Sequence, residues 1–434
     1  MNLEPYVAEQ PPRRRLVDGG AVLLAVPVPA AHSVSCGFWL RCGSEAEPAG
    51  WEGVTHFLEH AVFKGTDGLD AAGLARAFDR LGATVDAFTT KDHVAFTLRV
   101  LPEYFREAAD LLLAMVLRPA LEPEALARER EVVCAEIQEA HDTPEDRLHD
   151  AFTAALYGDH PRARPILGTA DRVRALDRDA VAAAHRALFA PDRQVVAVAA
   201  ADPEPLHGLL AERLQELAPP PGPAPAPRAA LTAAELLAGT VRRGRVLLLP
   251  ADLQQVYFEL GGRAVPFRHP DRIPLAVLTH LLGGGMSSRI FQTVREQEGL
   301  AYSIYTYTDL GRDTGLVSCA GSCDPANLER VVALVTGEYR RLLRDGVTAD
   351  ELETSRAQLK SQLIFSLEGV SNQMGRAARD EIMFGACQTV RDLVARVDAV
   401  TTDDLLRCAR LYFAPERLLL AVHGPRDDAP DPAG

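Results

Sequence analysis

The stretch "LFAPDRQVVAVAA", residues 188–200, decides the organisation of the fold because the chain carries a second version of it. That second version, "YFAPERLLLAVHG", occupies residues 412–424. Phe189 and Phe413 stand at equivalent places and are 224 positions apart. A short turn followed by a run of small and branched apolar residues is typical of a buried strand. The repetition indicates that one strand was copied together with its surroundings.

Two further pairs of segments support a duplication. The same offset carries "THFLEH" at 55–60 onto "THLLGG" at 279–284. A weaker pair joins "LEPEALARERE" at 121–131 to "VTADELETSRA" at 347–357. Correspondences that keep their order along the chain predict two copies of a domain of about 200 residues.

A proline-rich stretch, "APPPGPAPAPR" at 218–228, separates the two copies. Such a composition forms neither helix nor sheet and is typical of a semi-rigid linker. We therefore expect an N-terminal domain at 1–217, a linker at 218–232 and a C-terminal domain at 233–434.

Each copy mixes strands and helices. Residues 32–43, "HSVSCGFWLRCG", alternate as a half-buried strand does, and residues 21–29 are expected to be its hairpin partner. Residues 84–101 predict a second hairpin, and residues 69–82 predict a helix that ends at Gly82. Strands followed by blocks of helices indicate an α+β fold. We expect two homologous domains, each an antiparallel or mixed sheet with helices packed mainly on one face.

Composition limits the classes of partner and location. The net charge of −14 argues against nucleic acid and anionic membranes as main partners. No run of eighteen or more apolar residues occurs, so no membrane-spanning segment is expected. Seven scattered cysteines indicate reduced thiols, and the N-terminus lacks an apolar signal region. These features together predict a cytoplasmic protein.

The stretch "VTHFLEHAVFKGT" at 54–66 contains the strongest chemical signal. In a helix, His56 and His60 lie one turn apart on the same face, where two imidazoles can bind one metal ion. Glu59 lies on the same side and can act on a metal-bound water as general base. The order is the inverse of the H-E-x-x-H motif. Because a pattern this short also arises by coincidence, the interpretation requires a third ligand.

The helical segment 125–150 supplies candidates for that ligand. Four residues fall at helical spacing and would turn two carboxylates and an apolar stripe inward: Glu129, Val132, Val133 and Glu136. Glu136 is the favoured ligand because of its apolar neighbours. His141 and His149 are alternatives, although each lies near or beyond the expected end of the helix.

The combination of "HFLEHAVFKGT" with "EREVVCAEIQE" resembles the pitrilysin or insulinase-type family of zinc peptidases, also called inverzincins, and in particular its mitochondrial processing peptidase-like branch. The resemblance covers nearly the whole chain. It implies a zinc site of His56, His60 and Glu136, with Glu136 76 positions after His60. It also implies that Glu59 is the catalytic base and that Glu129 supports the site from behind.

The resemblance assigns a second set of residues to substrate. In "VREQEGLAYS" at 294–303, Arg295 and Tyr302 match the family's pair that binds substrate carbonyls and the tetrahedral intermediate. Without the resemblance they would read as a surface arginine and a packed tyrosine. The stretch "DAFTT" resembles the family's edge strand, to which a peptide adds as an extra strand. The substrate-binding residues implied there are Asp86, Ala87 and Phe88, and Asp86 stands where many relatives carry asparagine.

The second copy lacks the metal-binding groups. His280 aligns with His56, but Gly283 and Gly284 replace Glu59 and His60. We therefore expect one zinc ion per chain.

The family's chamber of four such domains implies a homodimer that cleaves peptides or unfolded segments. The alternatives are a non-catalytic scaffold or assembly subunit, and the active subunit of a heterodimeric processing peptidase.

Overall fold

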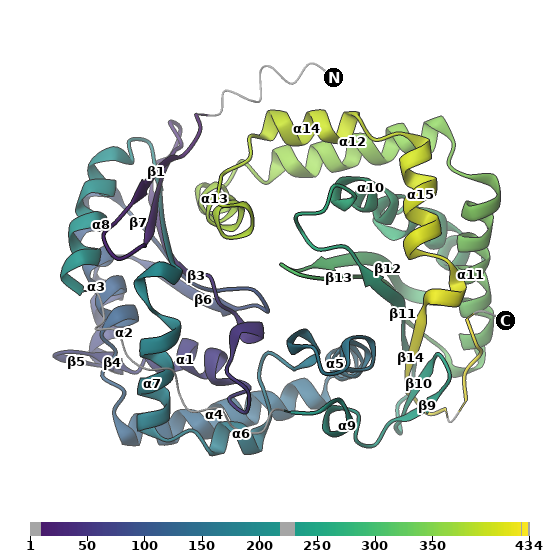
Figure 1. Cartoon of the computed structure of the whole chain (residues 1–434), viewed down its shortest axis with the longest axis horizontal. Helices are drawn as coiled ribbons and strands as arrows, with labels where there is room; N and C mark the ends of the chain where they lie inside the picture. The colour runs from purple at the N-terminus through teal and green to yellow at the C-terminus, as the bar shows by residue number, and fades with distance from the viewer. Residues whose placement is uncertain (1–9, 218–230, 427, 433–434) are drawn as a thin grey trace. The chain divides into compact units, whose positions relative to one another are not determined.

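The computed structural model describes residues 10–217, 231–426 and 428–432 (Figure 1). The chain forms two compact units. The first unit comprises 1–139, 164–231 and 364–390, and the second comprises 140–163, 232–363 and 391–434. The proline-rich stretch 218–228 lies outside the described residues.

The first unit is built on a six-stranded mixed sheet with the order β1-β2-β8-β3-β7-β6. Only the β2–β8 pair is parallel, and the other neighbours are antiparallel. The strands are β1 (Arg13–Leu16), β2 (Val22–Pro27), β3 (Val34–Leu40), β6 (Thr84–Thr89), β7 (Val94–Val100) and β8 (Gln194–Ala200). A separate two-stranded sheet pairs β4 (Gly65–Thr66) with β5 (Leu69–Asp70).

One of the two expected hairpins is confirmed and the other is wrong. β6 and β7 pair directly, as predicted for residues 84–101. β2 and β3 are not partners, because β8 lies between them and pairs with both. All seven residues of β8 are buried, so this strand belongs in the interior of a sheet with a neighbour on each side. A local pattern could not reveal that insertion, because β8 follows β3 by more than 150 residues.

Helices pack mainly on one face of this sheet and enclose its main core. Buried residues of α1, α3, α7 and α8 meet those of β3 and β7 there. Gly82, whose φ is +59°, ends the α2 segment in a left-handed conformation, as expected. The helices are α1 (Val54–Val62), α2 (Ala71–Arg80), α3 (Phe105–Leu117), α4 (Pro123–Asp142), α6 (Ala170–Arg174), α7 (Arg178–Leu188), α8 (Glu204–Leu217) and α13 (Val370–Phe384).

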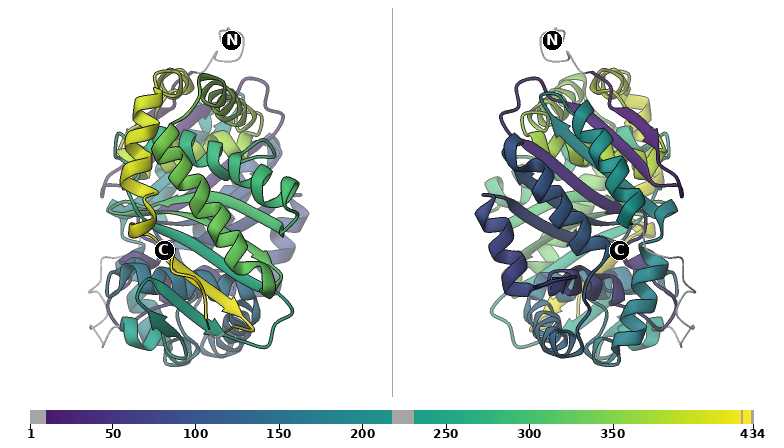
Figure 2. Two further views of the ribbon diagram at one scale, coloured as in Figure 1. Left: turned by 90° about the vertical axis from the view of Figure 1, so that its right-hand side faces the viewer. Right: turned by 90° about the vertical axis from the view of Figure 1, so that its left-hand side faces the viewer.

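The second unit repeats this plan. Its sheet has the order β12-β13-β11-β14-β10-β9, and its β10–β14 pair is parallel like β2–β8. The strands are β9 (Val241–Arg243), β10 (Val246–Pro250), β11 (Val256–Ala264), β12 (Ala301–Leu310), β13 (Gly315–Cys323) and β14 (Leu419–Gly424). The helices are α5 (Pro144–Tyr157), α9 (Ala233–Leu236), α10 (Arg272–Gly283), α11 (Leu328–Asp345), α12 (Ala349–Phe365), α14 (Val390–Asp398) and α15 (Thr402–Tyr412). The repeated strand order confirms the two homologous α+β domains, and Figure 2 shows helices lying across the strands of each unit.

The two halves of the sequence exchange one helix each. α13 comes from the second half but packs on β2, β3 and β8 of the first unit. α5 comes from the first half but packs on β10, β11 and β14 of the second unit. The carboxylate of Glu381, which is fully buried, accepts hydrogen bonds from Arg14 and Arg41 and so fixes α13 on its sheet. Apart from these exchanged segments, the units follow the two halves of the chain.

Among the described residues, no helix combines the length and the apolar character needed to cross a bilayer.

Candidate metal centre and active site

The helix α1 is held at its N-terminus by a carboxylate that the sequence analysis did not single out. The side chain of Glu47, which is buried, accepts hydrogen bonds from the backbone N–H groups of Gly53 at 3.0 Å and Thr55 at 2.8 Å. These N–H groups have no partner within the helix, so the carboxylate satisfies them. Gly53 has a φ of +90° and lets the chain turn sharply into the helix. The first turn of α1, which carries His56, is therefore fixed.

The structure brings the three predicted ligands together in the first unit. Nε2 of His56 lies 3.6 Å from Oε1 of Glu136, and Nε2 of His60 lies 3.5 Å from Oε2 of the same carboxylate. Donor atoms of the three residues all lie within 4.8 Å of one another, and no other such group occurs in the described part of the chain. Tetrahedral zinc with bonds of roughly 2.0–2.1 Å separates its ligands by about 3.4 Å. Two imidazoles and one carboxylate at these distances fit a zinc ion.

One part of the prediction for the ligand helix is wrong. Glu129 and Val133 of α4 are buried as expected, but the Val132 residue is 52% exposed. The inward face of α4 therefore consists of Glu129 and Val133, with Glu136 at its margin. The side chain of Glu136 is 41% exposed, so the metal-facing carboxylate also contacts solvent.

Glu129 contacts one of the predicted ligands from behind. Its Oε1 lies 2.8 Å from Nδ1 of His60, and its Oε2 lies 2.6 Å from Nζ of Lys64. Lys64 is one turn beyond His60, so the segment that supplies a ligand also supplies the cation that holds Glu129 in place. A carboxylate bonded to Nδ1 orients the ring so that Nε2 is free to bind metal. The buried Nδ1 of His56 has no corresponding partner among the described residues.

The electrostatic environment favours a cation at this point. Burial, followed by repulsion from His60, lowers the pKa of His56 to about 4, so this ring is neutral at pH 7 and its lone pair is available. The hydrogen bond to Glu129 raises the pKa of His60, with a further contribution from the charge of Glu136. The negative groups that draw a proton to His60 also favour a divalent ion.

Glu59 lies beside the three ligands without belonging to them. Burial raises the pKa of its carboxyl group, and the hydrogen bond from Thr89 opposes that effect. The hydroxyl of Thr89 donates to Oε2 of Glu59 at 2.5 Å. A carboxyl whose pKa is raised is better suited to accept and return a proton than an unperturbed one.

The predicted substrate strand lies at an edge. β6 is the last strand of the first sheet and pairs with β7 alone within the described residues. It carries Asp86, Ala87 and Phe88, and Phe88 is an exposed aromatic residue. Oδ1 of Asp86 accepts a hydrogen bond from the backbone N–H of Ala87.

In the second unit, Arg295 and Tyr302 lie against each other. The guanidinium carbon of Arg295 is 5.3 Å from the ring centre of Tyr302 and 4.8 Å from that of Phe291. Arg295 belongs to a short π-helix, Phe291–Gln297, and such helices are frequent at functional sites. Tyr302 is 81% exposed and sits at a bulge of β12. The pair is thus preassembled and open to solvent.

Close packing explains why the second copy has no metal centre. A Cβ atom at Gly283, the counterpart of Glu59, would lie 2.6 Å from the backbone nitrogen of Thr306. A Cβ atom at Gly284, the counterpart of His60, would lie 2.4 Å from Nδ1 of His280. The close approach of α10 to β12 leaves no room for a side chain at 283, and the ring of His280 fills the space beside 284.

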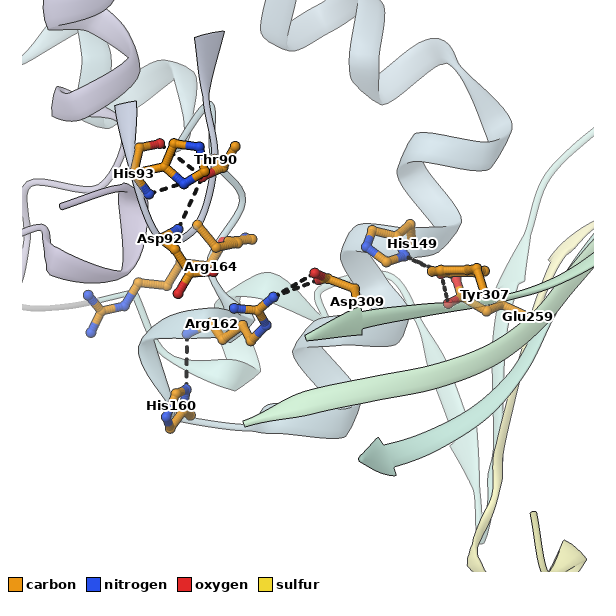
Figure 3. Close-up of polar contacts among 11 residues, drawn as sticks. Thr90, Asp92, His93, His149, His160, Arg162, Arg164, Glu259, Tyr307 and Asp309 are labelled. Atoms are coloured by element: carbon orange, nitrogen blue, oxygen red, sulfur yellow. Dashed lines mark hydrogen bonds and ion pairs between the residues drawn. The ribbon is translucent and has the colours of Figure 1, made fainter. Parts of the chain in front are cut away.

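The alternative histidine ligands lie elsewhere. His149 is in the second unit, where its Nδ1 lies 3.3 Å from Oε2 of Glu259 and 3.2 Å from the hydroxyl of Tyr307 (Figure 3). This cluster lines a cavity of about 450 Å³ together with Tyr305 and Asp146. His141 is likewise outside the group of metal-binding atoms. The cavity joins residues of α5, β11, β12 and β13, four segments that are separated in sequence, so no local pattern marked it.

Comparison with known proteins gives the family. Residues 23–170 match the family described as "Insulinase (Peptidase family M16)", and residues 175–359 match "Peptidase M16 inactive domain". An uncharacterized zinc protease of Mycobacterium tuberculosis (strain ATCC 25618 / H37Rv) is 35% identical over 418 residues, which cover 95% of this chain and 93% of that protein. The chain belongs to peptidase family M16.

Other relatives agree with this assignment to M16. An uncharacterized zinc protease of Bacillus subtilis (strain 168) is 31% identical over 425 residues, covering 96% of this chain and 99% of that protein. A protease from Helicobacter pylori has the same fold, with a TM-score of 0.85 at 21% identity and coverage of 96% of this chain and 100% of that one. A structure titled as a peptidase M16 inactive domain, from Pseudomonas fluorescens, also has a TM-score of 0.85, at 19% identity and coverage of 96% and 99%.

The Glu129 contact leads to a prediction about metal affinity. Glu129→Gln removes the charge that holds His60 and Lys64, so we expect zinc affinity to fall by about 10- to 100-fold. Competition with a chromogenic chelator measures this affinity directly. Glu131→Gln is the matched control, because Glu131 is exposed on the same helix and should leave affinity unchanged. Equal affinities for the two variants would show that Glu129 does not support the site.

Proposed function

We propose that this M16 protein is a zinc endopeptidase that hydrolyses peptides or unfolded protein segments. The observation that carries the proposal is the meeting of His56, His60 and Glu136 beside the carboxylate of Glu59, which is not one of the grouped donor residues. The names of the relatives as zinc proteases support the same class of reaction. The closer relation to processing peptidases stays a prediction from the sequence motif.

The chemistry divides between the metal and the chain. A zinc ion held by these three ligands would supply Lewis-acid activation of water. Glu59 would serve as the general base for the attacking water and would then return the proton to the leaving amine. Its partly buried position and raised pKa suit both transfers.

The edge of β6 suits an extended peptide. Main-chain hydrogen bonds to an added strand give affinity with little demand on sequence. Asp86, Ala87 and Phe88 would contact the residues nearest the cleaved bond. Aspartate stands at 86 where many relatives carry asparagine, so when ionised its side chain only accepts hydrogen bonds, whereas an asparagine could also donate them.

Arg295 and Tyr302 would stabilise the negative charge that develops on the substrate oxygen. Both groups donate hydrogen bonds, and removal of one such donor costs about 10²- to 10³-fold in kcat. A single chain contains one metal centre and one such pair, so we propose a homodimer in which each site is completed across subunits. The seven free cysteines favour a reducing compartment, and we place the activity in the cytoplasm.

Metal removal tests this function. The purified protein should contain one zinc ion per chain and cleave an internally quenched fluorescent peptide without another subunit. Dialysis against a chelator should abolish cleavage, and stoichiometric zinc should restore it, because apo-protein keeps the binding residues but lacks the Lewis acid. A protein without zinc would be a scaffold subunit. A zinc-loaded protein that is inactive alone would be the active subunit of a heterodimer.

A further inference from the structure

We propose that Thr89 is a positioning residue for the catalytic base and links that base to the strand that receives the substrate. The inference rests on the proposed function. Its starting point is the 2.5 Å hydrogen bond from the hydroxyl of Thr89 to Oε2 of Glu59. Thr89 is the last residue of β6, whereas Glu59 lies in α1.

The contact determines which carboxylate oxygen is free. Within the described residues, Thr89 is the hydrogen-bond partner of Glu59, and it occupies Oε2. Oε1 therefore keeps its lone pairs for the proton of the attacking water. A glutamate side chain has several freely rotating bonds, so a single charge-assisted hydrogen bond removes much of its positional freedom. The result is a base whose reactive oxygen is already oriented.

The backbone of Thr89 is itself well fixed. It pairs with Val94 across the β6–β7 ladder. The next residue, Thr90, closes the turn: its N–H donates to the carbonyl of His93, and its hydroxyl accepts from the N–H groups of Asp92 and His93 (Figure 3). The hydroxyl of Thr89 therefore starts from a defined point in the fold.

The same strand would receive the peptide. A segment that adds to the open edge of β6 adopts the register of that strand. The hydrogen bond from Thr89, the last residue of β6, fixes Glu59 relative to the same strand. Peptide and base are thus aligned to one common element. Catalysis requires the reacting atoms to lie within roughly 3–3.5 Å of each other. Holding the peptide and the base on the same strand favours that distance and so raises the rate.

Three substitutions test the role of the hydroxyl. Thr89→Val keeps the volume and the β-branched shape but removes the donor. We expect kcat to fall by about 10- to 100-fold, while KM stays within about twofold and zinc content is unchanged. Thr89→Ser keeps the hydroxyl and should retain kcat within about threefold of wild type. Thermal unfolding verifies folding, and Thr89→Ala replaces the valine variant if that variant does not fold.

Each alternative role gives a different result. Wild-type kcat in Thr89→Val would overturn the proposal, and so would an equal loss of kcat in the serine variant. A rise in KM with unchanged kcat would place Thr89 in substrate binding alone, and loss of zinc would place it in the metal site; both results also overturn it. Failure of the proposed function is separable, because the wild-type protein would then show no zinc-dependent peptidase activity, or Glu59→Gln would remain as active as wild type. If Glu59→Gln is inactive while Thr89→Val is normal, only the role of Thr89 is refuted.

Discussion

Replacing Glu59 with glutamine is expected to lower kcat for peptide cleavage by about 10²- to 10⁴-fold, while one zinc ion per chain stays bound. The substitution keeps the size of the side chain and the hydrogen bond from Thr89, since an amide oxygen also accepts. It removes the ability to take up a proton. None of the three ligands hydrogen-bonds to Glu59 among the described contacts: His60 is held by Glu129, His56 lies in the first turn of α1, and Glu136 lies on α4.

The measurement combines metal analysis with steady-state kinetics on one preparation. Glu103→Gln, at an exposed position ahead of α3, is the matched control and should behave as wild type. Unchanged turnover in Glu59→Gln would exclude Glu59 as the base. Loss of zinc together with activity would show instead that Glu59 belongs to the metal-binding set.

The sequence predicted the parts of the site that depend on local spacing. His56 and His60 are four positions apart, and any helix places them on one face. Their pairing with Glu136 was favoured by its apolar neighbours and strengthened by the resemblance to a family, because a helix of twenty residues offers several glutamates. Periodicity alone counted Val132 as inward, yet that residue is exposed. The spacing of residues along one helix does not indicate which other element packs against it, and so does not fix which face is buried.

Features that depend on distant segments were missed for the same reason. Lys64 and Thr89 look unremarkable in sequence, but each contacts an acid from another element. The insertion of β8 between β2 and β3 joins strands far apart in the chain. The exchange of α5 and α13 is similar, because an amphipathic pattern predicts a buried face but not the sheet that covers it.

Duplication explains why one copy could lose the metal centre without losing the fold. Gly283 lets α10 approach β12 more closely than a glutamate would allow, and Gly284 leaves room for the ring of His280. The space that holds reactive groups in the first unit is used for packing in the second. The second unit keeps Arg295 and Tyr302 instead, so the two units carry complementary parts of one proposed site.

That division predicts recovery of activity when two inactive chains are combined. Glu59→Gln inactivates the first unit, and Arg295→Ala inactivates the second. If each site joins the first unit of one chain to the second unit of its partner, a mixed dimer contains one site with both defects and one that is wild type throughout. Mixed dimers isolated through two different tags should therefore show about half of the wild-type kcat per dimer.

A second mixed dimer makes the result specific. In this control, one chain carries Glu59→Gln and its partner carries Glu136→Gln, so the first unit of each chain is defective. Every site is then damaged whether it forms within one chain or across two, and activity should stay at background. Recovery in the first pair but not in this control would establish sites shared between subunits. Background activity in both pairs would mean that each chain builds its site from its own two units. In that case the dimer would serve to enclose the substrate rather than to complete the chemistry.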